Sequence, residues 1–259
     1  MAHTHVLDRF KLDGKVALVT GGTRGLGYHM SMALADVGAN IAIAGRSLEP
    51  AQEAAKALTA ETGRRTAAFA ADVTRQADVQ KLVADVEQTL GPVDILVNSA
   101  GINIRGNADQ LTEDEWDTVI DINLKGTFLC SRAVGPGMVK RGWGRVINMG
   151  SILSVIAIPG RAAYASAKAG VANLTRVLAL EWAGTGVTAN AICPGPFGTD
   201  MNKTLLNDPV KYADFIRQLP IGRFGELHEL SGLVVYLASD ASSFMTGSSV
   251  FIDGGWTAK

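Results

Sequence analysis

Short apolar runs alternate with helix-like segments along the whole chain, and this alternation is the feature that most constrains the fold. Strands are expected at residues 15–20, 40–44, 66–71, 93–97, 145–149, 187–192 and 249–252. Val, Ile, Leu and Ala dominate these runs, which lack the polar–apolar alternation of a sheet with one wet face. Continuous apolar strands separated by helices indicate a parallel sheet with helices on both faces.

The intervening segments have helical periodicity and recognisable end signals. Helices are expected at residues 24–37, 49–62, 74–90, 112–140, 163–182 and 226–237. Thr112 and Glu115 have the spacing of a capping box, Thr74 is a candidate N-cap, and Pro136 is expected to interrupt the fourth helix. Because crossovers between parallel strands are right-handed, the pattern predicts a Rossmann-type, doubly wound α/β fold of three αβα layers.

One domain over residues 1–259 is the expected organisation, because no linker, repeat or low-complexity segment interrupts the pattern. Residues 1–12 are expected to form an N-terminal tail. Residues 197–225, which are polar and contain two prolines, are expected to form an irregular substrate-loop insertion. Hydrophobic residues make up 47% of the chain and charged residues 19%, which favours a well-packed core over disorder.

Charge and cysteine content exclude several function classes. The 24 basic and 25 acidic residues nearly cancel, so nothing indicates a nucleic-acid or membrane partner. The first residues lack a signal-peptide pattern and no apolar stretch is long enough to span a bilayer, so a cytoplasmic protein is expected. Cys130 and Cys193 lie far apart without metal-ligand spacing, so we expect two buried thiols and no metal site.

A glycine-rich segment, residues 20–27, joins the first expected strand to the first expected helix. Its sequence is Thr-Gly-Gly-Thr-Arg-Gly-Leu-Gly. Glycines let the backbone turn tightly and approach a pyrophosphate, while the helix N-terminus supplies N–H donors and partial positive charge. At the first β–α turn of a doubly wound sheet, this segment predicts a dinucleotide site.

The end of the second expected strand indicates which dinucleotide binds. An NAD site usually has an acid there that bonds the ribose 2′-hydroxyl, but this strand ends Ala-Gly-Arg-Ser at residues 44–47. Arg46 at the strand end and Arg24 in the glycine loop can grip a 2′-phosphate with charge-assisted bonds. The sequence therefore predicts NADP(H) rather than NAD(H).

Tyr164 and Lys168 lie four residues apart on an expected helix and so share one face. A phenol ordinarily ionises near pH 10, and an adjacent ammonium favours the phenolate. The pair is therefore a candidate for acid–base chemistry. Ser151 ends the strand before this helix, at the ligand edge of such a sheet, and Asn123 lies in the helix after the fourth strand.

In this order, these motifs resemble those of the short-chain dehydrogenase/reductase family over residues 10–256. The resemblance implies an oxidoreductase that transfers a hydride between NADP(H) and a carbonyl or secondary alcohol. Asn123, Ser151, Tyr164 and Lys168 fall where the family carries its catalytic tetrad. It implies that Tyr164 moves the proton, Lys168 lowers its pKa and bonds the ribose, Ser151 stabilises the oxyanion and Asn123 holds a water.

The resemblance also assigns a cofactor site. The expected cofactor-binding residues are Gly21, Thr23, Arg24, Gly25, Leu26, Gly27, Arg46, Ser47, Asp72, Val73, Asn98, Ser99, Ala100, Gly101, Ile122, Tyr164, Lys168, Pro194, Gly195, Phe197, Thr199 and Met201. Two positions depart from the family pattern. Ser99 replaces an asparagine, with a small expected effect, and Phe197 replaces a smaller aliphatic residue and is expected to narrow the nicotinamide end of the pocket.

The substrate is less constrained. Expected substrate-binding residues are Asn103, Arg105, Ser151, Leu153, Arg161, Tyr164 and Phe197. Arg105 and Arg161 could meet a carboxylate, and residues 101–105 resemble family members assigned as gluconate 5-dehydrogenases, so a sugar acid is one candidate.

Two alternatives remain open. A 3-oxoacyl-(acyl-carrier-protein) reductase would need a basic docking surface, for which Arg132, Lys140, Arg141 and Arg145 are candidates. A non-catalytic NADPH-binding sensor or scaffold would not need Tyr164 and Lys168 together. Family resemblance also implies a homotetramer assembled through the long helices and the last strand.

Overall fold

A twisted parallel sheet forms the centre of the computed structural model, which describes residues 5–199 and 208–258. Its seven strands follow the order β3-β2-β1-β4-β5-β6-β7. Their bounds are β1 Val16–Thr20, β2 Asn40–Gly45, β3 Thr66–Ala70, β4 Ile95–Asn98, β5 Gly144–Met149, β6 Val187–Pro194 and β7 Ser249–Ile252. The order reverses between β1 and β4, which places a ligand crevice at the carboxyl ends of these strands.

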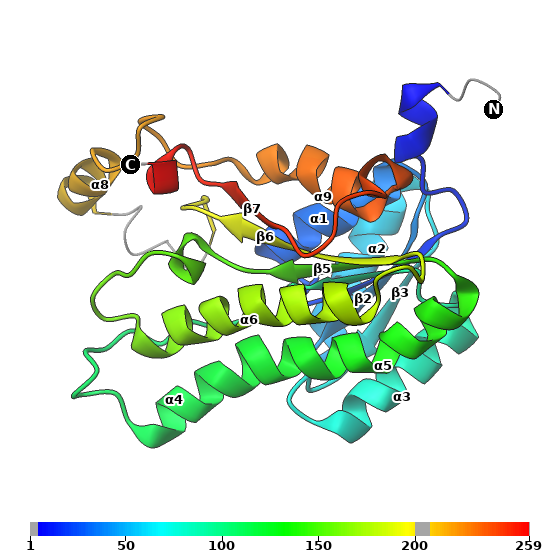
Figure 1. The fold of residues 1–259 in the computed structure, drawn as a ribbon, viewed down its shortest axis with the longest axis horizontal. Helices are drawn as coiled ribbons and strands as arrows, with labels where there is room; N and C mark the ends of the chain where they lie inside the picture. Colours follow the sequence, from blue (N-terminus) through cyan, green and yellow to red (C-terminus); the bar gives the residue numbers. More distant parts are fainter. Residues whose placement is uncertain (1–4, 200–207, 259) are drawn as a thin grey trace.

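Helices cover both faces of the sheet, as expected (Figure 1). One face packs against α1 (Gly25–Asp36), α2 (Leu48–Thr62) and α9 (Ser231–Ala238). The other face packs against α3 (Gln76–Thr89), α5 (Gly126–Arg141) and α6 (Ala162–Glu181), with α4 (Glu113–Ile120) beside α6. Every residue of β1, β4, β5 and β6 is buried, as expected for parallel strands covered on both faces.

The structure confirms the extent of the helix predicted over residues 112–140, but the helix is not interrupted at Pro136. Thr112 and Glu115 form the expected capping box at its start. A π-helical segment, η2 (Asp121–Lys125), then joins α4 to α5. Pro136 lies inside α5, which continues to Arg141, so the predicted break is wrong. The apolar face of α5 packs into the sheet core on both sides of the proline, and this packing offsets the lost backbone hydrogen bond.

Two further expectations need correction. Thr74 does not cap α3, because its N–H and hydroxyl both donate to Asp72 and Arg75 occupies the N-cap position. Residues 197–225 are not irregular throughout, since their described part contains α8 (Pro209–Ile216). Aromatic contacts hold this helix: the ring of Phe215 packs against the rings of Phe224 and Trp256.

Short helical turns complete the described chain. They are η1 (Val6–Phe10), η3 (Ile152–Ser154), η5 (Leu227–Leu230), η6 (Asp240–Ser242) and η7 (Trp256–Ala258). The turn η1 falls within the expected N-terminal tail and has no buried residues. Among the residues described, no helix is long and apolar enough to cross a membrane.

Candidate active site

The glycine loop after β1 forms a cradle that only glycines can line. Gly21 and Gly25 have φ values of +65° and +56°, in the left-handed region that favours glycine. A Cβ on Gly21 would lie 2.8 Å from the Cα of Ala100, and one on Gly27 would overlap the carbonyl oxygen of Gly21. The N-terminus of α1 opens directly onto this cradle. Space, N–H donors and helix polarity therefore suit a pyrophosphate.

The end of β2 has the positive charge expected from the sequence. Arg46 is exposed there, and Ser47 precedes α2 as its N-cap residue. The Oδ1 atom of Asp72, beyond β3, accepts hydrogen bonds from the N–H and hydroxyl of Thr74 at 2.9 and 2.8 Å. These bonds, with the positive charges of Arg75 and Arg46, lower the pKa of Asp72. Arg46 therefore lies close enough to influence the adenosine end of the site.

Arg24 is the N-cap residue of α1 and adopts an extended backbone. Val73 is buried against Gly126, where a Cβ would lie only 2.7 Å from the valine methyl carbon. Ile122 is half-buried against the core between the sheet and α5. Of these three, Arg24 adjoins the phosphate cradle directly, whereas Val73 and Ile122 contribute apolar packing beside it.

Asn98 at the end of β4 has a bracing role that its motif did not indicate. Its amide Nδ2 donates to the hydroxyl of Ser131 at 3.0 Å and to Oδ1 of Asn148 at 2.8 Å. Asn148 in turn donates to the hydroxyl of Thr175 in α6. This buried chain ties α5 and α6 to the sheet beneath the site. The backbone of Ser99 and Ala100 and the hydroxyl of Ser99 border the glycine cradle.

The four expected catalytic residues come together above the ends of β4 and β5. Lys168 is buried, its ammonium donates to the carbonyl of Met149 at 2.7 Å, and it lies 5.4 Å from the ring centroid of Tyr164. Ser151 caps η3, and its side chain lies near enough to Tyr164 to lower the pKa of the phenol. Ser151 and Lys168, from two successive segments of the chain, thus meet at one phenol.

Asn123 belongs to η2 and joins this group from the helix side. Its Nδ2 donates to the carbonyls of Ile102 and Val119, both at 2.9 Å. Its Oδ1 is buried and has no hydrogen-bond partner among the described residues. A Cβ on Gly101 would lie 2.6 Å from that Oδ1 and 3.7 Å from the Lys168 ammonium, so only a glycine lets the two side chains approach.

Burial sets the protonation of the catalytic pair. It raises the pKa of Tyr164 to about 12, against smaller lowering effects of the hydrogen bond with Ser151 and the charge of Arg161. Burial also lowers the pKa of Lys168 to about 8. The direction for Tyr164 is opposite to the expected lowering by Lys168, because desolvation outweighs nearby charge. At neutral pH the phenol is therefore a proton donor and the lysine is still charged.

The segment after β6 closes the site on the side of the glycine loop. The N–H of Gly195 donates to the carbonyl of Ile252 at 2.9 Å, and a side chain there would meet Asp253. The methyl group of Thr199 lies 4.0 Å from the position of a Cβ on Gly25, so this segment reaches the phosphate cradle. Met201 lies outside the described residues.

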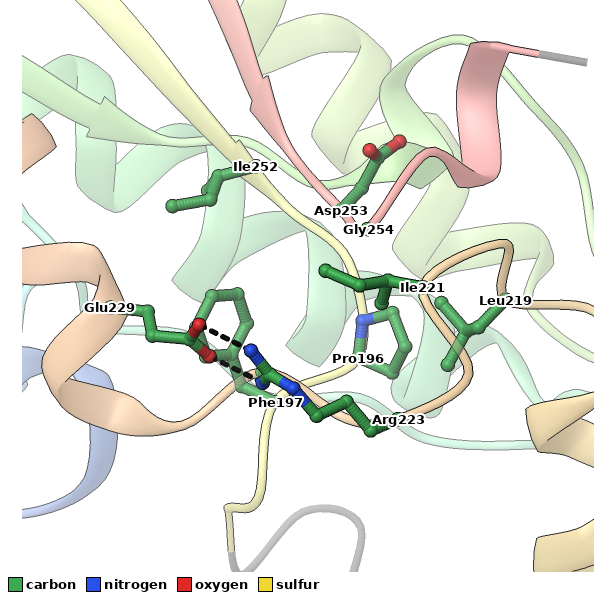
Figure 2. Close-up of a pocket in the computed structure, with 10 residues that line it drawn as sticks. Pro196, Phe197, Leu219, Ile221, Arg223, Glu229, Ile252, Asp253 and Gly254 are labelled. Carbon is green, nitrogen blue, oxygen red and sulfur yellow. Dashed lines mark hydrogen bonds and ion pairs between the residues drawn. The ribbon is translucent and has the colours of Figure 1, made fainter.

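Phe197, which is expected to narrow the nicotinamide end of the site, has a buried ring. Its ring is 4% exposed and packs against Gly225, where a Cβ would lie 2.7 Å from the ring. The ring lines a cavity of about 230 Å³ together with Pro196 and Ile221. Figure 2 shows the ring beside the ion pair of Arg223 and Glu229. The aromatic side chain therefore fills a core position between β6 and α9.

The expected substrate residues divide into a cationic pair and buried neighbours. A β-bridge between Gly106 and Arg161 brings Arg105 beside Arg161. Burial and the positive charge of Arg105 lower the pKa of Arg161, whose charge in turn reaches Tyr164. Leu153 is buried, and Oδ1 of Asn103 is buried without a hydrogen-bond partner among the described residues. Arg161 thus stands close to the phenol, with Arg105 beside it.

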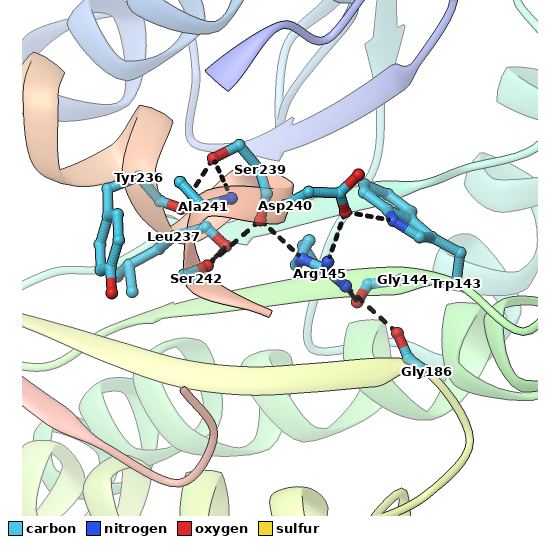
Figure 3. A network of polar contacts seen from close by, with 10 residues as sticks. All are labelled: Trp143, Gly144, Arg145, Gly186, Tyr236, Leu237, Ser239, Asp240, Ala241 and Ser242. Atoms are coloured by element: carbon cyan, nitrogen blue, oxygen red, sulfur yellow. Dashed lines mark hydrogen bonds and ion pairs between the residues drawn. The ribbon is translucent and has the colours of Figure 1, made fainter. Parts of the chain in front are cut away.

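Of the four residues considered for the basic surface of a carrier-protein reductase, Arg132, Lys140 and Arg141 are exposed and Arg145 is not. Arg145 is 2% exposed, and its guanidinium donates to Asp240 at 2.9 Å and stacks on Trp143 (Figure 3). Arg141 donates to the carbonyl of Val93. The expectation that Arg145 faces solvent is wrong, because β5 begins at the buried lower edge of the sheet.

Ser154 and Cys193 lie at the site although the sequence analysis did not assign them a role there. Ser154 bonds the backbones of Ser151 and Lys168, and Cys193 lies buried beneath Ser151. Both thiols are free and buried, as expected. In the sequence, Ser154 is a serine three residues after Ser151, and Cys193 is a cysteine directly before Pro194. Neither pattern is distinctive enough to have identified these residues.

Residues 21–257 match a family profile described as enoyl-(acyl carrier protein) reductase. The chain is 38% identical over 253 residues to gluconate 5-dehydrogenase of Gluconobacter oxydans, covering 97% of this chain and 98% of that protein. The chain belongs to the short-chain dehydrogenase/reductase family. Its tetrad and glycine loop occupy one site, so it is an oxidoreductase of that family.

Relatives of this short-chain dehydrogenase/reductase differ in substrate. Acetoacetyl-CoA reductase of Shinella zoogloeoides is 42% identical, with 93% of this chain and 98% of that protein covered. A crystal structure of gluconate 5-dehydrogenase from Burkholderia cenocepacia J2315, in complex with NADP and tartrate, has a TM-score of 0.93 and 39% identity. The match covers 98% of this chain and 100% of the Burkholderia chain. Similarity thus fixes the reaction class better than the substrate.

Proposed function

We propose that this oxidoreductase uses NADP(H) and interconverts a ketone and a secondary alcohol on a sugar acid. The phosphate cradle, with Arg24 beside it and Arg46 at the end of β2, supports a dinucleotide bearing a 2′-phosphate. No acid stands at the end of β2 to repel that phosphate. The NADP complex of the Burkholderia relative supports the same choice.

The chain's own residues would divide the proton chemistry. A bound nicotinamide cofactor would supply the hydride for the carbonyl carbon. Tyr164 donates its phenolic proton to the carbonyl oxygen, and Ser151 donates a hydrogen bond to the same oxygen. Lys168 holds positive charge beside the phenolate that forms. Asn123 holds its amide oxygen close to that ammonium, where a water could carry the replacement proton.

The observation that carries the substrate assignment is the arginine pair. Arg105 and Arg161 lie close enough for one to lower the pKa of the other, and the charge of Arg161 reaches Tyr164. Two like charges held together are stabilised when an anion joins them, and guanidinium groups suit the planar carboxylate. A substrate whose carboxylate meets this pair would place its carbonyl near the phenol. The tartrate in the Burkholderia relative is also a hydroxy-carboxylate.

The decisive measurement compares NADPH oxidation with 5-keto-gluconate and with an acetoacetyl thioester, using one enzyme preparation. We expect turnover of the sugar acid. In Arg105→Ala, the KM for that substrate should rise by about 10-fold, because the variant loses one charge-assisted hydrogen bond to the carboxylate. An uncharged ketose of equal carbon number serves as the matched substrate, and its KM should not change. Turnover of the thioester alone would contradict the assignment and favour a lipid-synthesis reductase.

Two further parts of the proposal concern assembly and location. We place the enzyme in the cytoplasm as a homotetramer built through the long helices and the last strand. Exposed apolar side chains on those helices support this assembly: Trp116 on α4, Phe128 on α5, and Val177 and Leu180 on α6. Trp256 gives no such support, because it is buried within its own chain.

Light scattering at micromolar concentration is expected to give four times the chain mass. Charging the exposed apolar surface should shift the mass downward, since unpaired charge is costly in an apolar interface. Leu180→Glu is the variant of choice because this side chain is 78% exposed and its replacement leaves the core intact. A monomer mass for the wild-type protein would refute the tetramer.

A further inference from the structure

We propose that Ser154 is a positioning residue that holds the catalytic serine, Ser151, in register with the helix carrying Tyr164 and Lys168. The inference rests on the proposed roles of Ser151 and Tyr164. It concerns a residue outside the catalytic tetrad. Ser154 acts through Ser151 rather than on the substrate.

One oxygen atom makes the connection. The hydroxyl of Ser154 accepts a hydrogen bond from the backbone N–H of Ser151 at 3.3 Å and donates one to the carbonyl of Lys168 at 2.9 Å. The first bond fixes the backbone that carries the serine, and the second fixes the backbone of α6. Ser151 follows β5, whereas Lys168 lies in the next helix, so no local secondary structure sets their separation.

Close packing prevents this bridge from shifting. Cys193, at the end of β6, is fully buried below it. A Cβ on Gly150 would lie 2.6 Å from the Cys193 sulfur and 3.2 Å from the Ser154 hydroxyl, so only glycine fits between them. Burial raises the pKa of the Cys193 thiol, although the nearby Ser154 hydroxyl and Ser151 N–H act in the opposite direction.

The bridge acts on the hydrogen bond between Ser151 and Tyr164. The Ser151 hydroxyl also accepts from the N–H of Leu153 at 3.1 Å, so its rotation is already set by the turn η3. The distance from this turn to α6 is held by Ser154, alongside the bond from the Lys168 ammonium to the carbonyl of Met149. Loss of the bridge would weaken the bond that lowers the pKa of Tyr164, and the phenol pKa would rise.

The test compares Ser154→Ala with Ser154→Thr, which keeps the hydroxyl, and with Ser166→Ala, a matched loss of a hydroxyl on the exposed face of α6. We expect kcat to fall about 10-fold in Ser154→Ala, as for one lost hydrogen bond, while the KM for NADPH stays unchanged. In alcohol oxidation, the apparent pKa that limits kcat should move upward. Ser154→Thr should recover most of the rate, and Ser166→Ala should match wild type.

A wild-type rate and pH profile in Ser154→Ala would overturn the inference, as would a Ser154→Thr enzyme no better than Ser154→Ala. A fall in kcat that comes with a lower melting temperature but no pH shift would also overturn it, because that pattern belongs to a structural role. Ser151→Ala and Tyr164→Phe separate this failure from a wrong mechanism. If Ser151→Ala and Tyr164→Phe keep their activity, the proposed mechanism is wrong. If those two variants lose activity and Ser154→Ala keeps it, the mechanism stands and only the role of Ser154 is wrong.

Discussion

Replacing Tyr164 by phenylalanine is expected to lower kcat by about a thousand-fold, within the range for loss of a general acid. The change removes one oxygen and keeps the ring that packs beside Ile152 and Leu153. The phenol is the proton donor best placed beside Ser151, and burial keeps it protonated at neutral pH. Single-turnover oxidation of NADPH by the ketone substrate measures this effect.

NADPH fluorescence provides the control for Tyr164→Phe, because the glycine cradle, Arg24 and Arg46 are unchanged. Its Kd should stay within about two-fold of wild type, well below the ten-fold change that corresponds to about 1.4 kcal/mol. Turnover above a tenth of the wild-type rate would contradict the assignment of Tyr164 as the acid. Such a result would reopen the interpretation of the chain as an NADPH-binding sensor whose tetrad has no catalytic use.

The pH profile of the wild-type enzyme follows from the same pair. Burial lowers the pKa of Lys168 to about 8. The side chain is therefore a charged ammonium below that pH and a neutral amine above it. Because its charge stabilises the phenolate that forms as Tyr164 gives up its proton, ketone reduction should be fastest below about pH 8 and decline above it. Tyr164 itself remains protonated through this range.

The order of strands and helices could be predicted from sequence because each carries its own periodicity. The place of the glycine loop after β1 follows from the apolar run that precedes it, which is buried throughout. Pro136 shows where local reasoning stops. The residue is a helix breaker by itself, but α5 buries an apolar face along its whole length and continues through it.

Residues of the site were predictable when a motif fixed them and unpredictable when their role depended on burial. Tyr164 and Lys168 were identified from spacing, but the direction of the tyrosine pKa depends on desolvation that no spacing reveals. Arg145 and Phe197 have residue types typical of a surface and of a pocket lining. Both are buried because of where β5 begins and how Gly225 approaches β6.

Removing both Arg24 and Arg46 is expected to raise the KM for NADPH by about 100-fold, with roughly ten-fold from each exposed charge-assisted contact. The KM for NADH should change little, because NADH lacks the 2′-phosphate that the guanidiniums would bind. Replacing Arg46 with aspartate instead should lower the KM for NADH, since an acid at the end of β2 can accept a hydrogen bond from the ribose 2′-hydroxyl. Steady-state kinetics with each cofactor at saturating ketone measures both effects.

Arg75→Ala is the matched control for these charge changes. Arg75 is exposed in the same neighbourhood, and its positive charge also lowers the pKa of Asp72, but it caps α3 rather than ending β2. Loss of Arg75 should leave the preference for NADPH intact. It lowers the positive potential of the neighbourhood, but salt screens that effect, and it removes no contact that distinguishes the two cofactors. An equal loss for NADPH and NADH in the double variant would mean that Arg24 and Arg46 support the shared pyrophosphate or the loop itself. In that case the preference would have to come from the adenosine pocket around Asp72.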